Sequence, residues 1–131
     1  MRSPYQVLVL DDEEMVCERL KSHLEKKGFE VETFTESPAA IERMTDKGFD
    51  VVITDVKMEG PSGLDVLHFV RRESPGTQVI VITGYGSVET IREAEYGGAF
   101  EFINKPFTSK DMEALTLKAA KKARKQGVGE D

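Results

Sequence analysis

The chain has 131 residues, of which 39% are hydrophobic and 32% are charged, and its net charge is −6. This length fits one domain with a proper core, and the composition excludes a disordered chain. The acidic balance argues against direct binding of nucleic acid by this domain. Cys17 is the single cysteine, so an intrachain disulfide is excluded, and a reducing, cytoplasmic location is expected. No apolar run approaches the roughly 18 residues that span a membrane.

Five short apolar segments alternate with five helical patterns along the chain. The segments at 6–10, 50–54 and 78–82 are almost continuously apolar, as strands covered on both faces by helices are. The segment 29–34 alternates apolar and polar residues and is predicted to be an edge strand, and 99–103 supplies the fifth strand. This alternation predicts an α/β fold with a doubly wound, five-stranded parallel sheet and five helices.

The predicted helices have recognisable first residues and apolar faces. Ser37, followed by Pro38, is predicted to be the N-cap of the second helix, because proline fits the first helical position. Thr108, with Asp111 three residues later, is predicted to cap the last helix. Cys17 lies inside the first helix and is predicted to be a small buried apolar residue. The residues predicted to face the core are Val16, Leu20 and Leu24, then Leu64, Leu67 and Val70, then Val88, Ile91 and Ala94.

Side chains with chemical function follow four of the strands at one edge of the predicted sheet. Asp11 and Asp12 follow the first strand, Asp55 the third, Thr83 the fourth and Lys105 the fifth. In an open parallel sheet, ligands bind beyond the carboxyl ends of the strands, so these side chains are expected to lie together. The helix dipole also favours acids in a first helical turn, so the stretch 11–14 taken alone fits either interpretation. That second interpretation does not explain Asp55, which precedes a loop.

Three carboxylates at one point require a cation. Two unit charges about 4 Å apart repel each other by about 4 kcal/mol at an effective dielectric constant of about 20. An all-oxygen set with room for water suits Mg²⁺ better than zinc, and neither His23 nor His68 has the spacing of a zinc site. With the ammonium of Lys105 and the hydroxyl of Thr83 beside it, Asp55 is predicted to be a nucleophile that forms an acyl phosphate.

These motifs resemble the receiver domain of a bacterial two-component response regulator. The resemblance covers about residues 5–125 and implies a flavodoxin-like sheet with the strand order 2-1-3-4-5. It implies that the chain is not an enzyme but a phosphoacceptor switch that assists its own phosphorylation and dephosphorylation. The receiver is predicted to cover residues 1–126, with 127–131 as a flexible tail or the start of a linker. The residues that carry the resemblance are Asp11-Asp12, Asp55, Thr83 and Lys105-Pro106-Phe107.

The resemblance assigns the phosphoryl group and the metal to particular residues. Asp55 would accept the phosphoryl group from a phosphohistidine of a sensor histidine kinase. Asp12, Asp55 and the backbone carbonyl of Lys57 would bind Mg²⁺, and Asp11 would act mainly through metal-bound water. Lys105 would contact the acyl phosphate.

The resemblance also implies a switch. The hydroxyl of Thr83 would turn toward the phosphoryl group and leave space into which Phe102, the switch aromatic, rotates. The loop 83–87 has two glycines and is predicted to act as the hinge. The expected result is a population shift at the face formed by the fourth helix, fifth strand and fifth helix, through which a homodimer would form.

The sequence departs from the family pattern at several positions. Glu59 stands where the family usually has proline, and it adds negative charge close to the predicted metal site. Phe102 replaces the common tyrosine, and Lys57 and Tyr85 occupy positions that influence acyl phosphate hydrolysis in this family. The resemblance also makes the bond between Lys105 and Pro106 a candidate for cis geometry.

Three alternatives stay open at this stage. A phosphatase with an aspartyl nucleophile usually carries a second acid two residues later, where this chain has Lys57. A flavin or nucleotide module would need a phosphate-binding glycine loop after the first strand, where this chain has four acids. A degenerate receiver used for docking is disfavoured because all five chemical residues are present.

The segment 82–107 resembles receivers of sigma-54-type transcriptional activators and predicts an output domain, linked to DNA, outside this chain.

Overall fold

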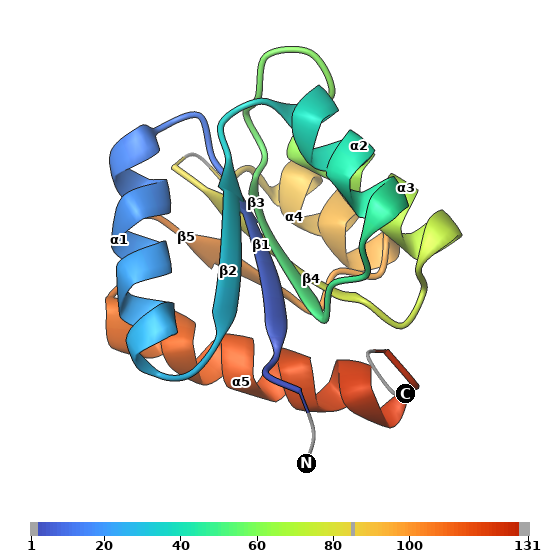
Figure 1. The fold of residues 1–131 in the computed structure, drawn as a ribbon. Coiled ribbons are helices and arrows are strands. Elements are labelled where there is room, and N and C mark those ends of the chain that lie inside the picture. The colour runs from blue at the N-terminus through green and yellow to red at the C-terminus, as the bar shows by residue number, and fades with distance from the viewer. Residues whose placement is uncertain (1–2, 85, 129–131) are drawn as a thin grey trace.

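The computed structural model describes residues 3–84 and 86–128, so Tyr85 lies outside the described residues. Five parallel strands form one sheet in the order β2-β1-β3-β4-β5, which confirms the predicted doubly wound fold and places β2 at an edge (Figure 1). The strands are β1 (Gln6–Leu10), β2 (Glu30–Phe34), β3 (Val51–Asp55), β4 (Gln78–Thr83) and β5 (Glu101–Asn104).

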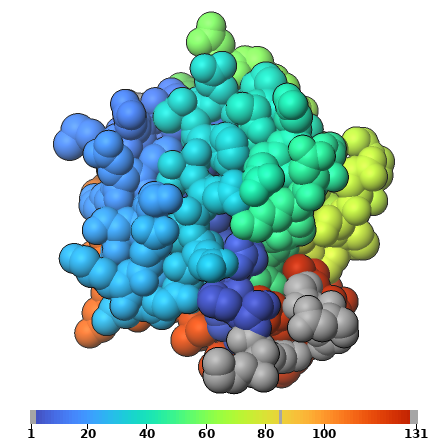
Figure 2. Space-filling model, viewed as in Figure 1, coloured from blue at the N-terminus to red at the C-terminus, as the bar shows by residue number. Residues whose placement is uncertain are grey.

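The five helices cover both faces of the sheet (Figure 1). One face carries α1 (Glu14–Lys26) and α5 (Ser109–Lys125), and the other carries α2 (Ser37–Asp46), α3 (Gly63–Glu73) and α4 (Val88–Tyr96). In the space-filling view, side chains of α1 and α2 flank the edge strand β2 on either side (Figure 2). Within the described part of the chain, no helix combines the length and the apolar character that crossing a membrane requires.

The core lies in two layers because successive residues of a strand point to opposite faces. In β1, Val7 and Val9 join the cluster beneath α1 and α5, whereas Leu8 and Leu10 join the cluster beneath α2, α3 and α4. All four side chains are fully buried. Cys17 is also buried, as predicted, and burial raises the pKa of its thiol to about 11.

The helix starts confirm one predicted cap and contradict another. The side chain of Thr108 accepts a hydrogen bond from the backbone N–H of Asp111 at 3.0 Å, as predicted. Ser37 is not an N-cap, because Glu36 has that position and Ser37 is the first residue of α2. The hydroxyl of Ser37 instead donates to the carbonyl of Pro61 at 2.6 Å, which ties α2 to the loop that follows β3.

The prediction that Val88 faces the core is wrong, since 65% of this residue is exposed. Helix α4 reaches the core through Ala94, which is fully buried, and through Gly97, where an added Cβ would lie 2.8 Å from Leu67. Both contacts are near the end of the helix. Its first turn, with Val88, therefore remains at the surface.

A buried ion pair closes the edge of the sheet at which the strands begin. Arg124, near the end of α5, is bonded to both carboxylate oxygens of Asp50 at 2.7 and 3.0 Å, and both residues are at most 2% exposed. Arg124 also donates to the carbonyls of Ser3 and Pro4, so it ties the end of α5 to the first residues of the described chain. Beyond it, the N–H of Val128 bonds to the carbonyl of Ala123 at 3.2 Å. The assignment of 127–131 to a tail or linker stays a prediction.

Candidate functional site

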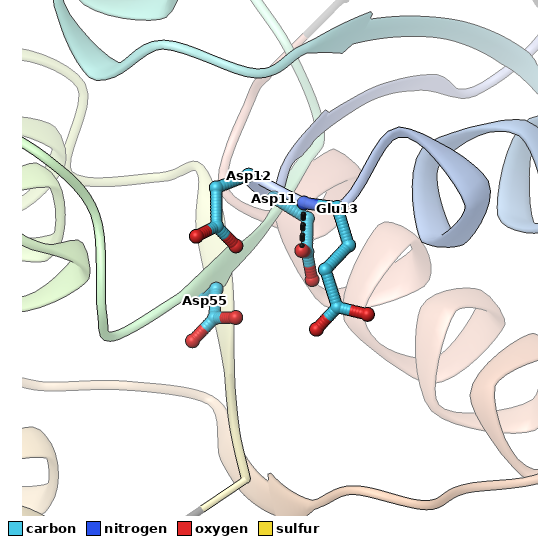
Figure 3. A group of neighbouring side chains, drawn as sticks. All are labelled: Asp11, Asp12, Glu13 and Asp55. Atoms are coloured by element: carbon cyan, nitrogen blue, oxygen red, sulfur yellow. Dashed lines mark hydrogen bonds between the residues drawn. The ribbon is translucent and has the colours of Figure 1, made fainter.

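Four carboxylates meet beyond the carboxyl ends of β1 and β3. The two strands are neighbours with Leu10 opposite Thr54, so the residues that follow, Asp11 and Asp55, arrive at the same edge. Carboxylate oxygens of all four acids lie within 4.8 Å of one another, and we call these four residues the acidic cluster (Figure 3). The three aspartates are therefore brought together as predicted. The cluster consists of Asp11, Asp12, Glu13 and Asp55.

The members of the acidic cluster differ in burial. Asp11 is fully buried and Asp55 is 5% exposed, whereas Asp12 and Glu13 are exposed. Burial raises the pKa of Asp11, against the opposing effects of the Glu13 N–H, which donates to Asp11 Oδ1 at 2.8 Å, and of Lys105. In Asp55, Oδ1 accepts a hydrogen bond from the backbone N–H of Lys57 at 3.1 Å.

Lys105 supplies the positive charge of the site. Its Nζ lies 2.9 Å from Oδ2 of Asp11, 2.9 Å from Oδ2 of Asp55 and 3.1 Å from Oε1 of Glu13. Burial alone would favour the neutral amine, but the hydrogen bonds to these carboxylates outweigh it and raise the pKa of Lys105 above its usual value. The lysine is held in place because its backbone N–H bonds to the carbonyl of Thr83 at 2.7 Å. The bond to Pro106 is cis, as the resemblance suggested.

The acidic cluster has the donor set of a hard divalent cation. All its ligand atoms are carboxylate oxygens, and in the described part of the chain Lys105 pairs with three of the four carboxylates, so the site keeps an excess of negative charge. The buried Oδ2 of Asp11 pairs with Nζ of Lys105 at 2.9 Å and accepts no hydrogen bond from any other described residue. This oxygen therefore remains available to a metal-bound water.

The loop after Asp55 folds back on the strand that carries it. The N–H of Gly63 bonds to the carbonyl of Val56 at 2.9 Å, and a Cβ added at Gly63 would lie only 2.0 Å from the carbonyl oxygen of Asp55. Ser62 then caps α3 in a reciprocal capping box with Asp65. Only a glycine fits where the start of α3 lies against the end of β3.

The remaining predicted residues lie at different places around this edge. Thr83 ends β4, next to β3, and is 2% exposed. Phe102 is on β5, half-buried and packed against the core layer beneath α2, α3 and α4. Glu59 lines a surface hollow together with Asp12, so it does add negative charge beside the cluster. The side chain of Lys57 is exposed.

Two residues of the site were missed by sequence reasoning. Glu13 directly follows Asp12, so the run of four acids at 11–14 was the signal, but that run also fits a helix N-terminus. Gly63 stands directly before the apolar helical pattern of Leu64, Leu67 and Val70, which indicates a helix start and nothing more. Its contact with Asp55 is tertiary and left no pattern in the sequence.

Comparisons with known proteins identify the family of the chain. The family pattern described as the response regulator receiver domain matches residues 7–117. The chain belongs to the receiver family. This receiver is 34% identical over 120 residues to a putative NtrX-like response regulator of Rickettsia typhi, and 34% identical over 125 residues to the probable transcriptional regulatory protein TcrX of Mycobacterium tuberculosis. These alignments cover 90% and 95% of the receiver.

A solved receiver has the same fold. The solution structure of the beryllofluoride-activated NtrC4 receiver domain dimer matches with a TM-score of 0.79 and 35% identity, covering 92% of this chain and 97% of that one. The receiver spans only 25% of the Rickettsia protein and 52% of TcrX. The resemblance found in the sequence is therefore confirmed for the family, a signalling switch of two-component systems.

Proposed function

We propose that Asp55 accepts a phosphoryl group from a phosphohistidine of a sensor histidine kinase. The observation that carries this proposal is the position of its carboxylate at the carboxyl-terminal edge of the sheet. It lies 2.9 Å from the ammonium of Lys105 and within 4.8 Å of the carboxylate oxygens of three other acids. A carboxylate placed among like charges is a poor structural element, but it is a good nucleophile once cations neutralise its neighbours.

The transfer forms one bond and breaks another. A carboxylate oxygen of Asp55 attacks phosphorus, the P–N bond of the phosphohistidine breaks, and its electron pair stays with the kinase imidazole, which takes up a proton. The product is an acyl phosphate. Lys105 has a raised pKa, so its ammonium stays protonated and can pair with the phosphoryl oxygens. Water that attacks phosphorus later returns the carboxylate and releases phosphate.

The acidic cluster would hold Mg²⁺ during this step. Asp12, Asp55 and the backbone carbonyl of Lys57 are the proposed protein ligands, with Asp11 acting through water. The bound cation would neutralise the charge that gathers on the phosphoryl oxygens. Glu13 remains a counter-ion of Lys105, from which the ammonium must turn when it meets the phosphoryl group.

Phosphorylation would shift the conformational equilibrium of the surface formed by α4, β5 and α5. Thr83 would turn toward the phosphoryl oxygens and Phe102 would follow into the space that it leaves. Helix α4 exposes Val88 at 65% and Tyr96 at 90%, apolar area that suits contact with a second copy. The dimeric NtrC4 receiver supports a homodimer, for which we propose this face. The name of the transcriptional regulatory protein TcrX supports control of transcription by an output domain outside this chain. We propose that the receiver acts in the cytoplasm.

Labelling with acetyl phosphate and Mg²⁺ tests the proposal. The unaltered chain should gain one phosphoryl group by intact mass, Asp55→Asn should gain none, and Asp46→Asn, a control at an exposed aspartate in α2, should label normally. EDTA should abolish labelling. Substantial labelling of Asp55→Asn would exclude this residue as the acceptor, and labelling that persists in EDTA would remove the metal from the reaction.

The same preparation separates a receiver from a phosphatase. An aspartyl phosphatase would hydrolyse p-nitrophenyl phosphate in many turnovers, whereas a receiver should leave such phosphomonoesters intact. Steady turnover that Asp55→Asn abolishes would favour the enzyme.

A further inference from the structure

The ring of Phe102 lies directly beside the place where Gly86 would otherwise carry a side chain. Gly86 lies in the loop between β4 and α4, and Phe102 is on the neighbouring strand β5. A Cβ added at Gly86 would lie 3.2 Å from Cε1 and 3.4 Å from Cζ of Phe102, and 2.8 Å from Oδ1 of Asn104. The amide of Asn104 is the tip of an exposed side chain and can turn away, whereas the aromatic ring is half-buried and can move only as a rigid unit.

The other glycine of the loop, Gly84, has no such neighbour. A Cβ added at Gly84 meets nothing within 4 Å, and neither Gly84 nor Gly86 has the positive φ that disfavours other residues. The backbone therefore does not require glycine at either position. What distinguishes Gly86 is the aromatic ring beside it.

We propose that Gly86 is a positioning residue of the switch, because its missing side chain leaves the space beside the β4–α4 loop in which the Phe102 ring rests. A methyl group at 86 competes with the ring for that space. The ring then spends less time beside the loop and more time in the alternative position that it takes when the acceptor is occupied. This inference rests on the proposed function, in which the position of Phe102 is linked to the phosphoryl site at Asp55.

Thermodynamic linkage makes the effect measurable at the acceptor. If occupancy of the acceptor moves the ring away from Gly86, then a substitution that moves the ring away must favour occupancy by the same factor. For beryllofluoride, a phosphoryl analogue, Gly86→Ala is expected to lower the apparent dissociation constant about two- to fivefold in the presence of Mg²⁺. Gly84→Ala makes the same chemical change in open space, so its dissociation constant should stay within about 1.5-fold of the unaltered chain.

Two measurements decide the proposal. Beryllofluoride titrations followed by NMR give the dissociation constants of the unaltered chain, Gly84→Ala, Gly86→Ala, Phe102→Leu, and Gly86→Ala combined with Phe102→Leu. The Phe102 ring resonances, assigned by comparison with Phe102→Leu, should shift in Gly86→Ala without beryllofluoride and stay unchanged in Gly84→Ala. In the Phe102→Leu background, Gly86→Ala should no longer change the dissociation constant, since the ring is gone.

The outcomes separate this inference from the proposed function. Equal dissociation constants and equal ring shifts for Gly84→Ala and Gly86→Ala would overturn the inference and leave Asp55 as the acceptor. An effect of Gly86→Ala that persists in the Phe102→Leu background would also overturn it, because the loop rather than the ring would be responsible. A chain that binds no beryllofluoride and takes no phosphoryl group from acetyl phosphate would instead contradict the proposed function, and with it the link between the ring and the acceptor.

Discussion

Replacing Gly63 by alanine tests whether the start of α3 fixes the position of the acceptor. The added Cβ would lie 2.0 Å from the carbonyl oxygen of Asp55 and 2.9 Å from Cα of Val56. Ordinary contact begins near 3.4 Å, so α3 and the acceptor strand must separate by about 1.4 Å. Overpacking of this kind costs about 1–3 kcal/mol, whereas reduced chain entropy returns about 0.4–1 kcal/mol. The variant should therefore lose about 1–2 kcal/mol of unfolding free energy.

The same displacement of β3 should also slow phosphorylation of Asp55. A misplacement of about 1 Å can slow a positioned reaction about 100-fold, so labelling of Gly63→Ala by acetyl phosphate should slow at least tenfold. Urea unfolding and intact-mass labelling measure the two effects. Gly48→Ala is the matched control, because a Cβ there meets nothing within 4 Å. If both variants unfold at the same urea concentration and label at the same rate, Gly63 does not position the acceptor.

Three further perturbations probe the charges. Glu13→Gln removes an exposed carboxylate from the acidic cluster, so half-maximal labelling should need about two- to fivefold more Mg²⁺ at constant ionic strength, and an unchanged requirement would exclude a role for Glu13. Arg124→Met leaves Asp50 buried without its cation, so the free energy of unfolding measured in urea should fall by about 3–5 kcal/mol. A loss below about 1 kcal/mol would show that the ion pair does not stabilise the fold. Hydrogen bonding to Arg43 lowers the pKa of Glu32 to about 2, from 4.5, so this carboxylate stabilises the fold above pH 4.5, and the contribution is lost as the pH falls through 2. After allowance for solvent screening, Glu32→Gln should cost about 1–2 kcal/mol at pH 7 in urea unfolding and progressively less toward pH 2; an equal cost at both ends would refute this.

The sheet and most of its acidic edge could be predicted because both depend on short-range pattern and topology. Continuous apolar runs identify strands buried on both faces, and parallel strands bring their carboxyl ends to one edge. That rule alone placed Asp11 beside Asp55, although 43 residues separate them in the sequence. It also placed Lys105 there, and the structure gives 2.9 Å from its Nζ to each of the two carboxylates.

What could not be predicted depends on contacts between elements. Gly63 and Gly86 look like ordinary loop glycines in the sequence, and only the packed structure shows that one lies against the backbone of Asp55 and the other against an aromatic ring. Ser37 has the sequence signature of an N-cap, but a carbonyl from another loop competes for its hydroxyl. Val88 follows the helical period, yet α4 packs through its other end. In each case tertiary packing overrode a local preference.

Two aspartates at opposite ends of β3, Asp50 just before the strand and Asp55 at its last residue, have different charge environments. Asp50, before the strand, has both oxygens bonded to one arginine, and one of them also accepts the N–H of Gln6, so the charge is matched and fully buried. Asp55, at the end of the same strand, shares a single lysine with Asp11 and Glu13. A buried carboxylate whose charge is matched has little to gain from a ligand, whereas one in a cluster with excess negative charge gains from every cation that arrives. We therefore attribute the proposed binding of a cation and transfer of a phosphoryl group at this edge, and not at the other, to the deficit of positive charge at Asp55.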